Sequence, residues 1–109
     1  ASPQAGYRAA VLAALEDVED ARSTFTGSVA RALSLSAAEQ KATELTRLTR
    51  TQYRDGQADY AALSGAETAL LDTRDALATA RAERAGAAIR LCVALGGGAP
   101  LPAAKSASK

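Results

Sequence analysis

Apolar side chains recur every three or four positions along residues 7–53, a stretch without Pro and with a single Gly, Gly27. This spacing predicts one helix over residues 7–53, roughly 70 Å long at about 1.5 Å per residue. The stripe shifts near residues 33–35, as a skip in a coiled-coil repeat does. Its expected members are Val11, Leu15, Val18, Phe25, Val29, Leu33, Leu35, Ala38, Ala42, Leu45 and Leu48.

A more regular repeat predicts a second helix over residues 60–95. Leucines recur at seven-residue spacing, interrupted by Arg84, and small residues fill the companion positions. A repeat of large and small residues lets two helices approach closely and coil around each other. We expect the seam between the helices to contain Leu63, Ala66, Leu70, Leu77, Ala80 and Leu91.

Residues 54–59 are expected to form the tip that joins the two helices. Gly56 suits the left-handed backbone that ends a helix, and Asp59 is a good cap for the start of the next one. The ends of two helices leave carbonyl and amide groups that polar partners can satisfy. The sequence therefore predicts a docking tip made of Tyr53, Arg54, Asp55, Gly56, Gln57, Asp59 and Tyr60.

Together these elements predict an all-α fold, a long antiparallel hairpin over residues 7–98 that resembles a coiled coil. The register set by Gly56 brings Glu39 near Arg74 and Asp20 near Arg90. Three glycines at 96–98 stop the second helix, and residues 99–109 are expected to be a disordered tail. Two helices bury only one seam, so apolar residues on other faces indicate a part of a larger helical assembly.

Composition narrows the possible functions. The chain has 109 residues, no His, one Cys and a net charge of +1. Without His and without a second Cys, the usual general base, thiolate metal sites and disulfides are missing, so we expect no enzyme and no cofactor. The near-zero charge gives no indication of nucleic acid binding. The first residues lack both Met and a basic signal region, which suggests a processed protein or an excised fragment.

Three local features have two interpretations each. The acidic group Glu16, Asp17, Glu19 and Asp20 could bind a cation, but a solvated face, or one that lines the interior of an assembly, is favoured. The stripe Arg47, Arg50 and Arg54 could bind nucleic acid, but no aromatic residues alternate with it, so contact with neighbouring helices or a protein partner is favoured. Cys92 could be a redox thiol, but its apolar neighbours favour buried packing.

Four motifs in order and in register resemble the outer-membrane efflux protein family, over about residues 7–98. The first helix begins with Tyr7-x3-Val11-x3-Leu15-Glu16-x-Val18-Glu19-x-Ala21, and the tip reads Tyr53-Arg54-x-Gly56-x2-Asp59-Tyr60. The second helix contains Thr68-x-Leu70-Leu71-x3-Asp75-x-Leu77-Ala78-x-Ala80-Arg81, and the closing segment is Ala94-Leu95-Gly96-Gly97-Gly98. Within that family's protein, the chain resembles only one part, the C-terminal periplasmic hairpin.

The resemblance implies a duct segment that carries small molecules passively across the outer membrane. The parent protein would be a homotrimer in the outer membrane with a twelve-helix periplasmic barrel. It would work with a periplasmic adaptor protein and an inner-membrane pump, and the hairpin tip would meet the adaptor. In this family an Asp commonly stands at the position of Gly65, so the resemblance does not imply a cation-selecting ring at this position. The alternative is a generic coiled-coil interaction or oligomerisation module without a transport role.

Overall fold

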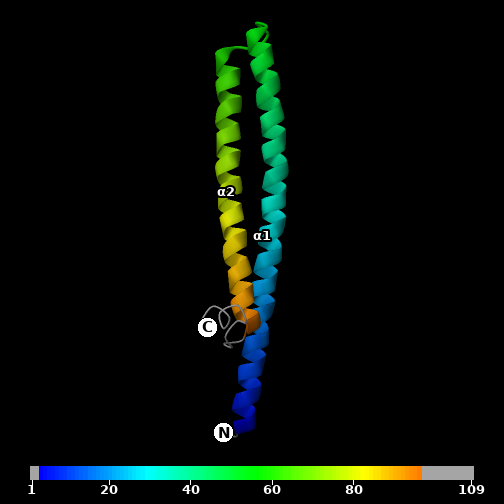
Figure 1. Cartoon of the computed structure of the whole chain (residues 1–109), viewed down its shortest axis with the longest axis vertical. Helices are drawn as coiled ribbons and strands as arrows, with labels where there is room; N and C mark the ends of the chain where they lie inside the picture. The colour runs from blue at the N-terminus through cyan, green and yellow to red at the C-terminus, as the bar shows by residue number, and fades with distance from the viewer. Residues whose placement is uncertain (1–2, 97–109) are drawn as a thin grey trace, which may run out of the picture. The chain divides into compact units, whose positions relative to one another are not determined.

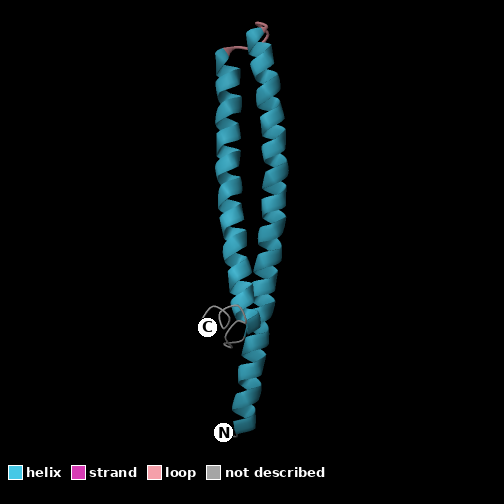
Figure 2. Ribbon diagram, in the orientation of Figure 1, coloured by secondary structure: helices cyan, strands magenta, loops and turns pink. Residues whose placement is uncertain are grey.

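The computed structural model describes residues 3–96, which form two helices joined by a short turn (Figures 1 and 2). Helix α1 runs over Pro3–Arg54 and helix α2 over Tyr60–Gly96, and no strand occurs in this part of the chain. The expected all-α hairpin is confirmed. Helix α1 begins at Pro3 rather than at Tyr7, which suits a Pro because its missing amide is not needed in a first helical turn. The expected tail, 99–109, lies outside the described residues.

The hairpin divides into two packing units, each described by itself. The tip unit comprises residues 28–84, and the terminal unit comprises the described residues 3–27 and 85–96. Helix α1 and helix α2 each contribute a segment to both units.

In the tip unit, α2 supplies the large side chains of the seam and α1 supplies small ones. Leu63, Leu70 and Leu77 are each less than a tenth exposed, as their repeat predicts. Ala80 is buried as well, whereas Ala66 is half-buried. Opposite them, the buried residues of α1 are Ala32, Thr46 and Thr49. Leucines that fill the spaces above small residues let the two backbones approach closely.

The apolar stripe expected on α1 is only partly right in the tip unit, where Leu35 and Ala42 lie in the seam but other expected members do not. Leu33, Leu45 and Leu48 are 65%, 58% and 47% exposed, so they lie outside the seam. The buried and half-buried positions instead follow alternating steps of three and four residues without a skip, through Ser28, Ala32, Leu35, Glu39, Ala42, Thr46 and Thr49. The stripe failed because several of these positions are polar.

The two threonines fit in the seam because their hydroxyls are satisfied. The Thr46 and Thr49 hydroxyls each donate to the carbonyl four residues earlier, at 2.8 Å. The Thr46 hydroxyl also lies 3.2 Å from the Ala66 carbonyl oxygen on α2, which links the two helices. No buried side-chain polar atom of the described residues lacks a partner. A satisfied hydroxyl avoids the desolvation cost of about 1–3 kcal/mol that an unpaired one would bring.

Three ion pairs cross between the helices of the tip unit. The predicted Glu39–Arg74 contact is confirmed, with 3.1 Å between Oε2 and Nε. Arg31 and Glu83 lie 3.6 Å apart, and Arg50 and Glu67 lie 3.4 Å apart. Exposed pairs contribute only about 0–1 kcal/mol each, so they support the register more than the stability.

The terminal unit is packed less completely. Ala87 is 2% exposed, and Leu91, expected in the seam, is half-buried. The predicted contact of Asp20 with Arg90 does not occur as an ion pair within residues 3–96. The Arg90 guanidinium instead lies back along its own helix, 3.6 Å from where a Cβ on Gly86 would stand. That distance is an ordinary van der Waals contact, so the arrangement does not depend on Gly86 lacking a side chain.

Candidate functional site

The tip begins where α1 ends, and its backbone closes on itself. The Gly56 amide donates to the Tyr53 carbonyl at 3.1 Å, and the Gln57 amide donates to the Gln52 carbonyl at 2.8 Å. This pair of bonds around a left-handed residue is the Schellman motif. Gly56 has a φ of +78°, and no other atom lies within 4 Å of a Cβ built on it. Glycine is therefore required here by backbone conformation and not by lack of space.

Helix α2 starts with a side-chain cap. The Asp59 carboxylate accepts a hydrogen bond from the Ala62 amide at 2.9 Å, and its carbonyl accepts one from the Leu63 amide at 3.3 Å. A cap of this type stabilises a helix by about 0.5–2 kcal/mol. The tip was expected to leave its helix-end groups for a partner to satisfy. That expectation is wrong for the carbonyls of Gln52 and Tyr53 and the amides of Ala62 and Leu63.

What the tip offers a partner is side chains. The rings of Tyr53 and Tyr60 meet edge to face with centroids 6.0 Å apart, and they are 41% and 64% exposed. Arg54, Asp55 and Gln57 are exposed around them. Tyr and Arg are the side chains most enriched among residues that dominate protein interfaces. The predicted tip residues are thus brought together in one place.

The basic stripe of α1 is mostly neutralised by neighbouring acids. Arg47 pairs with Glu44 on the same helix, through Nε and Oε2 at 3.1 Å, and Arg50 pairs with Glu67. The hydrogen bond from Arg47 lowers the pKa of Glu44, and the same bond raises the pKa of Arg47. Within residues 3–96, Arg54 makes no ion pair. The free positive charge of the stripe therefore lies at the tip.

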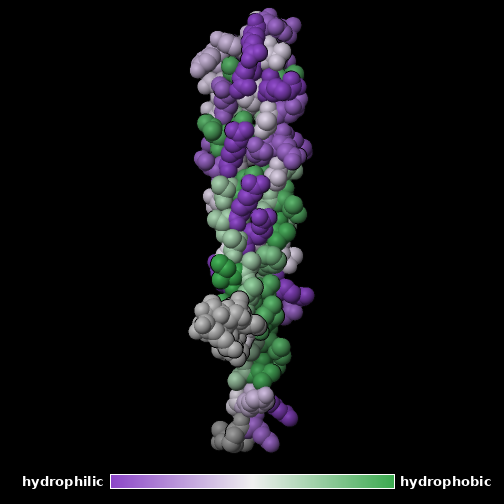
Figure 3. Space-filling model, viewed as in Figure 1, coloured by the Kyte–Doolittle hydropathy of each residue, from purple (hydrophilic) through white to green (hydrophobic). Residues whose placement is uncertain are grey.

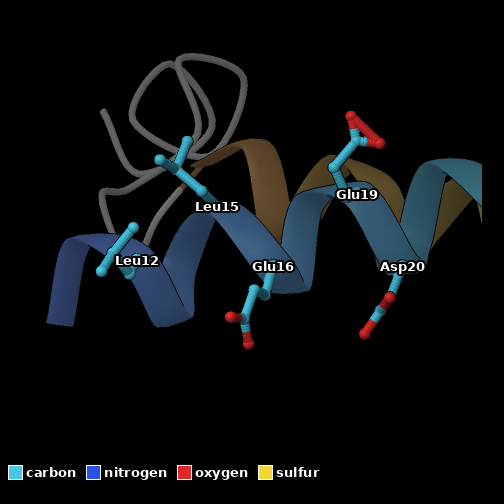
Figure 4. A pocket seen from close by; sticks show the side chains of 5 residues that line it. All are labelled: Leu12, Leu15, Glu16, Glu19 and Asp20. Carbon is cyan, nitrogen blue, oxygen red and sulfur yellow. The ribbon is translucent and has the colours of Figure 1, made fainter. Parts of the chain in front are cut away.

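The acidic group of α1 does not converge on a point. Figure 4 shows Glu19 on one side of the helix, and Glu16 and Asp20 on the other. Glu19 is paired with Arg22 at 3.3 Å. In the described part of the chain, no three His, Cys, Asp or Glu residues are placed to hold a metal ion. The interpretation of a solvated face agrees with this geometry better than a cation site does.

Two other sequence positions need comment. Cys92 is exposed, so the expectation of buried packing is wrong. The residue lies outside the repeat that Leu91 and Ala94 follow, and apolar neighbours in sequence do not place it in the seam. Gly65 is exposed too, with open space where a side chain would stand. A carboxylate would fit at this position but is not present.

The comparisons with known proteins agree with the hairpin. The searches of curated proteins and of solved structures found no match to this chain. Neither helix, over residues 3–96, has an apolar stretch long enough to cross a membrane. The model of one family, described as outer membrane efflux protein, matches residues 1–97, which is most of the chain. The chain therefore belongs to the outer membrane efflux protein family.

Proposed function

We propose that the chain is the periplasmic helical hairpin of an outer-membrane efflux duct, a trimer in its parent protein. Family membership supports a role in an outer-membrane efflux channel. The hairpin would form part of the duct wall through which small molecules pass without any reaction. The parent would act with a periplasmic adaptor and an inner-membrane pump.

The observation that carries the proposal is the set of large apolar side chains outside the seam. In the tip unit Leu33, Leu45 and Leu71 are all more than half exposed. In the terminal unit Ile89 and Val93 are 65% and 63% exposed. Figure 3 shows apolar residues among the polar ones on the visible surface. Covering one such side chain stabilises an assembly by about 1.5–3 kcal/mol, so neighbouring helices are the natural cover.

Adaptor docking at the tip is the finer part of the proposal. The exposed Tyr53 and Tyr60 rings and the unpaired Arg54 are suited to an interface, and the closed turn holds them in place. Since the turn is already ordered, a partner would not have to order it on binding. We therefore expect substitutions at the tip to affect the adaptor contact and to leave trimer formation unchanged.

The test uses the full-length parent protein with Arg54→Glu, which reverses the one charge of the basic stripe that makes no ion pair within residues 3–96. Lys41→Glu is the matched control, because Lys41 is an exposed cation of the same helix away from the tip. Cross-linking to the adaptor and efflux should fall for Arg54→Glu, while trimer level stays constant in both variants. Normal cross-linking and full efflux for Arg54→Glu would exclude docking through this residue.

The mass of the isolated chain in solution tests the assembly argument separately. A trimer or larger species supports cover of the exposed apolar residues by other helices. A clean monomer would contradict self-association of this hairpin. The isolated chain could form an oligomer while its parent protein neither reaches the outer membrane nor supports efflux. That result would favour a coiled-coil module without a transport role.

A further inference from the structure

The terminal unit contains a groove on α1 that the described part of α2 does not cover. Figure 1 shows α1 continuing past the end of α2. One hollow along this segment is lined by Leu12, Leu15, Glu16, Glu19 and Asp20 (Figure 4). Leu12 and Leu15 are 60% and 58% exposed. We call this hollow the terminal groove, with an apolar end at the two leucines and carboxylates at its edges.

The apolar end of the groove continues toward the start of α1. A second hollow, which shares Leu12, is lined by Tyr7, Arg8 and Val11. Tyr7 and Val11 fall on the same alternating three- and four-residue spacing as the seam, yet they are 72% and 41% exposed. The seam stripe of α1 is therefore longer than the helix that covers it.

Charge narrows the choice of occupant. The segment 3–27 carries four acidic residues and two basic ones. Glu16 and Asp20 lie on one edge of the groove, and within residues 3–96 neither makes an ion pair. A fitting occupant therefore has a short apolar segment and nearby positive charge, and no acidic residue of its own.

The sequence that follows α2 has this composition. Residues 97–109 contain Leu101 between two prolines, then Lys105 and Lys109, and no acid. They continue directly from Gly96, and Gly96 belongs to the same unit as the groove. Thirteen residues reach roughly 40 Å at about 3.1 Å per residue, whereas the α1 segment 7–20, which lines both hollows, spans only about 20 Å. The segment is therefore long enough to reach every part of the groove.

We infer that residues 97–109 bind back onto the terminal groove of their own chain. Leu101 with its flanking prolines covers Leu12 and Leu15, and the amines of Lys105 and Lys109 meet the carboxylates of Glu16 and Asp20. Pro-rich segments suit apolar grooves because little conformational freedom remains for them to lose on binding. This contact extends the cover of α1 beyond the end of α2, and it does not depend on the efflux role.

Zero-length cross-linking of the whole chain with a carbodiimide tests the inference, because this reagent joins amines only to carboxylates in contact with them. Peptide mass spectrometry should find Lys105 and Lys109 joined to Glu16, Glu19 or Asp20. Lys41, the remaining lysine, serves as an internal control and should not join these acids. Mixing isotopically heavy and light chains distinguishes links within one chain from links between two.

Leu101→Ser removes the apolar anchor, and Ser106→Ala is the matched control within the same segment. Loss of one buried Leu should lower the yield of the cross-links about tenfold, with hairpin helicity unchanged. The control should keep the yield of the unaltered chain. The inference is overturned by links spread equally over acids of the tip unit, by an unchanged yield for Leu101→Ser, or by links found only between heavy and light chains.

Discussion

Replacing Ala80 by Leu tests how closely the two helices approach in the tip unit. Ala80 is 1% exposed, and Ala32 of α1 is 3% exposed. The Arg31–Glu83 ion pair joins the two helices next to these alanines. A Leu at position 80 adds three carbon atoms where small side chains are packed on both helices. The added atoms would have to push the helices apart or take strained side-chain conformations.

The expected destabilisation is about 1–3 kcal/mol, the usual cost of overpacking a close contact. The difference in helix propensity between Ala and Leu is a few tenths of a kcal/mol, which is too small to mask it. For a domain of this size, 1 kcal/mol lowers the melting temperature by about 4–8 °C. Thermal unfolding followed by circular dichroism should therefore resolve the effect clearly.

Ala82→Leu is the matched control, since Ala82 is exposed on the same helix. It makes the same chemical change where there is room, and its effect should stay within about 0.5 kcal/mol. If Ala80→Leu melts at the same temperature as Ala82→Leu, or above it, the helices are not in close contact at this level. The small-residue explanation of the seam would then be wrong.

Three further changes test other parts of the hairpin. Gly56→Val should cost about 1–3 kcal/mol in urea unfolding because of backbone strain, whereas Gly56→Asn should cost less, since Asn tolerates φ values above zero. Thr46→Val keeps the shape and loses one hydroxyl, so the free energy of unfolding should change by less than about 1 kcal/mol; a larger loss would show that the link to α2 matters more than packing. The hydrogen bond from Arg74, then that from Thr43, lowers the pKa of Glu39 below 4.5. The melting temperature should therefore be constant above that pH and fall below it, with a smaller fall in Glu39→Gln.

Helix α2 could be predicted from its sequence because the face that packs in the seam carries large apolar residues at regular spacing. Leu63, Leu70 and Leu77 are large, apolar and seven apart, and all three are buried. Hydrophobic spacing is a reliable signal when the seam of a helix is made of leucine. The tip was also readable, since Gly56 and Asp59 are residue types that end and begin helices for local reasons.

Helix α1 could not be predicted in the same way. Its seam includes Thr46, Thr49 and Glu39, whose polar groups find partners that hydropathy does not reveal. Leu45 and Leu48 directly precede the two threonines and are more hydrophobic. The prediction therefore assigned the leucines to the seam, although they lie on another face of the helix. A signal was present, because Ala32, Ala42, Thr46 and Thr49 are small residues that share one three- and four-residue spacing. The choice between the two stripes depends on α2, whose leucines require small partners.

The burial of Cys92 was also predicted wrongly because the hydropathy of neighbouring residues does not show which face of the helix a residue occupies. Its neighbours in sequence are apolar, but Leu91 and Ala94 continue the repeat of α2 while Cys92 and Val93 lie outside it. Burial in a two-helix hairpin is decided by the angle around the helix, so apolar neighbours along the chain are poor evidence. An apolar stretch on the outer side indicates a further partner and not a core.

The contacts across the seam have consequences for the order in which the hairpin forms. The Arg50–Glu67 and Thr46–Ala66 contacts join residues only 17 and 20 apart, while Glu39 and Arg74 are 35 apart. Each doubling of the closed segment adds only about 0.6 kcal/mol of loop entropy, and contacts formed earlier shorten what remains to be closed. Folding can therefore start at the turn, and the contacts between the helices can then form one after another toward the termini. The first contacts set the register between the two helices, and every later contact forms in that register. An error in register therefore has to be avoided or corrected near Gly56.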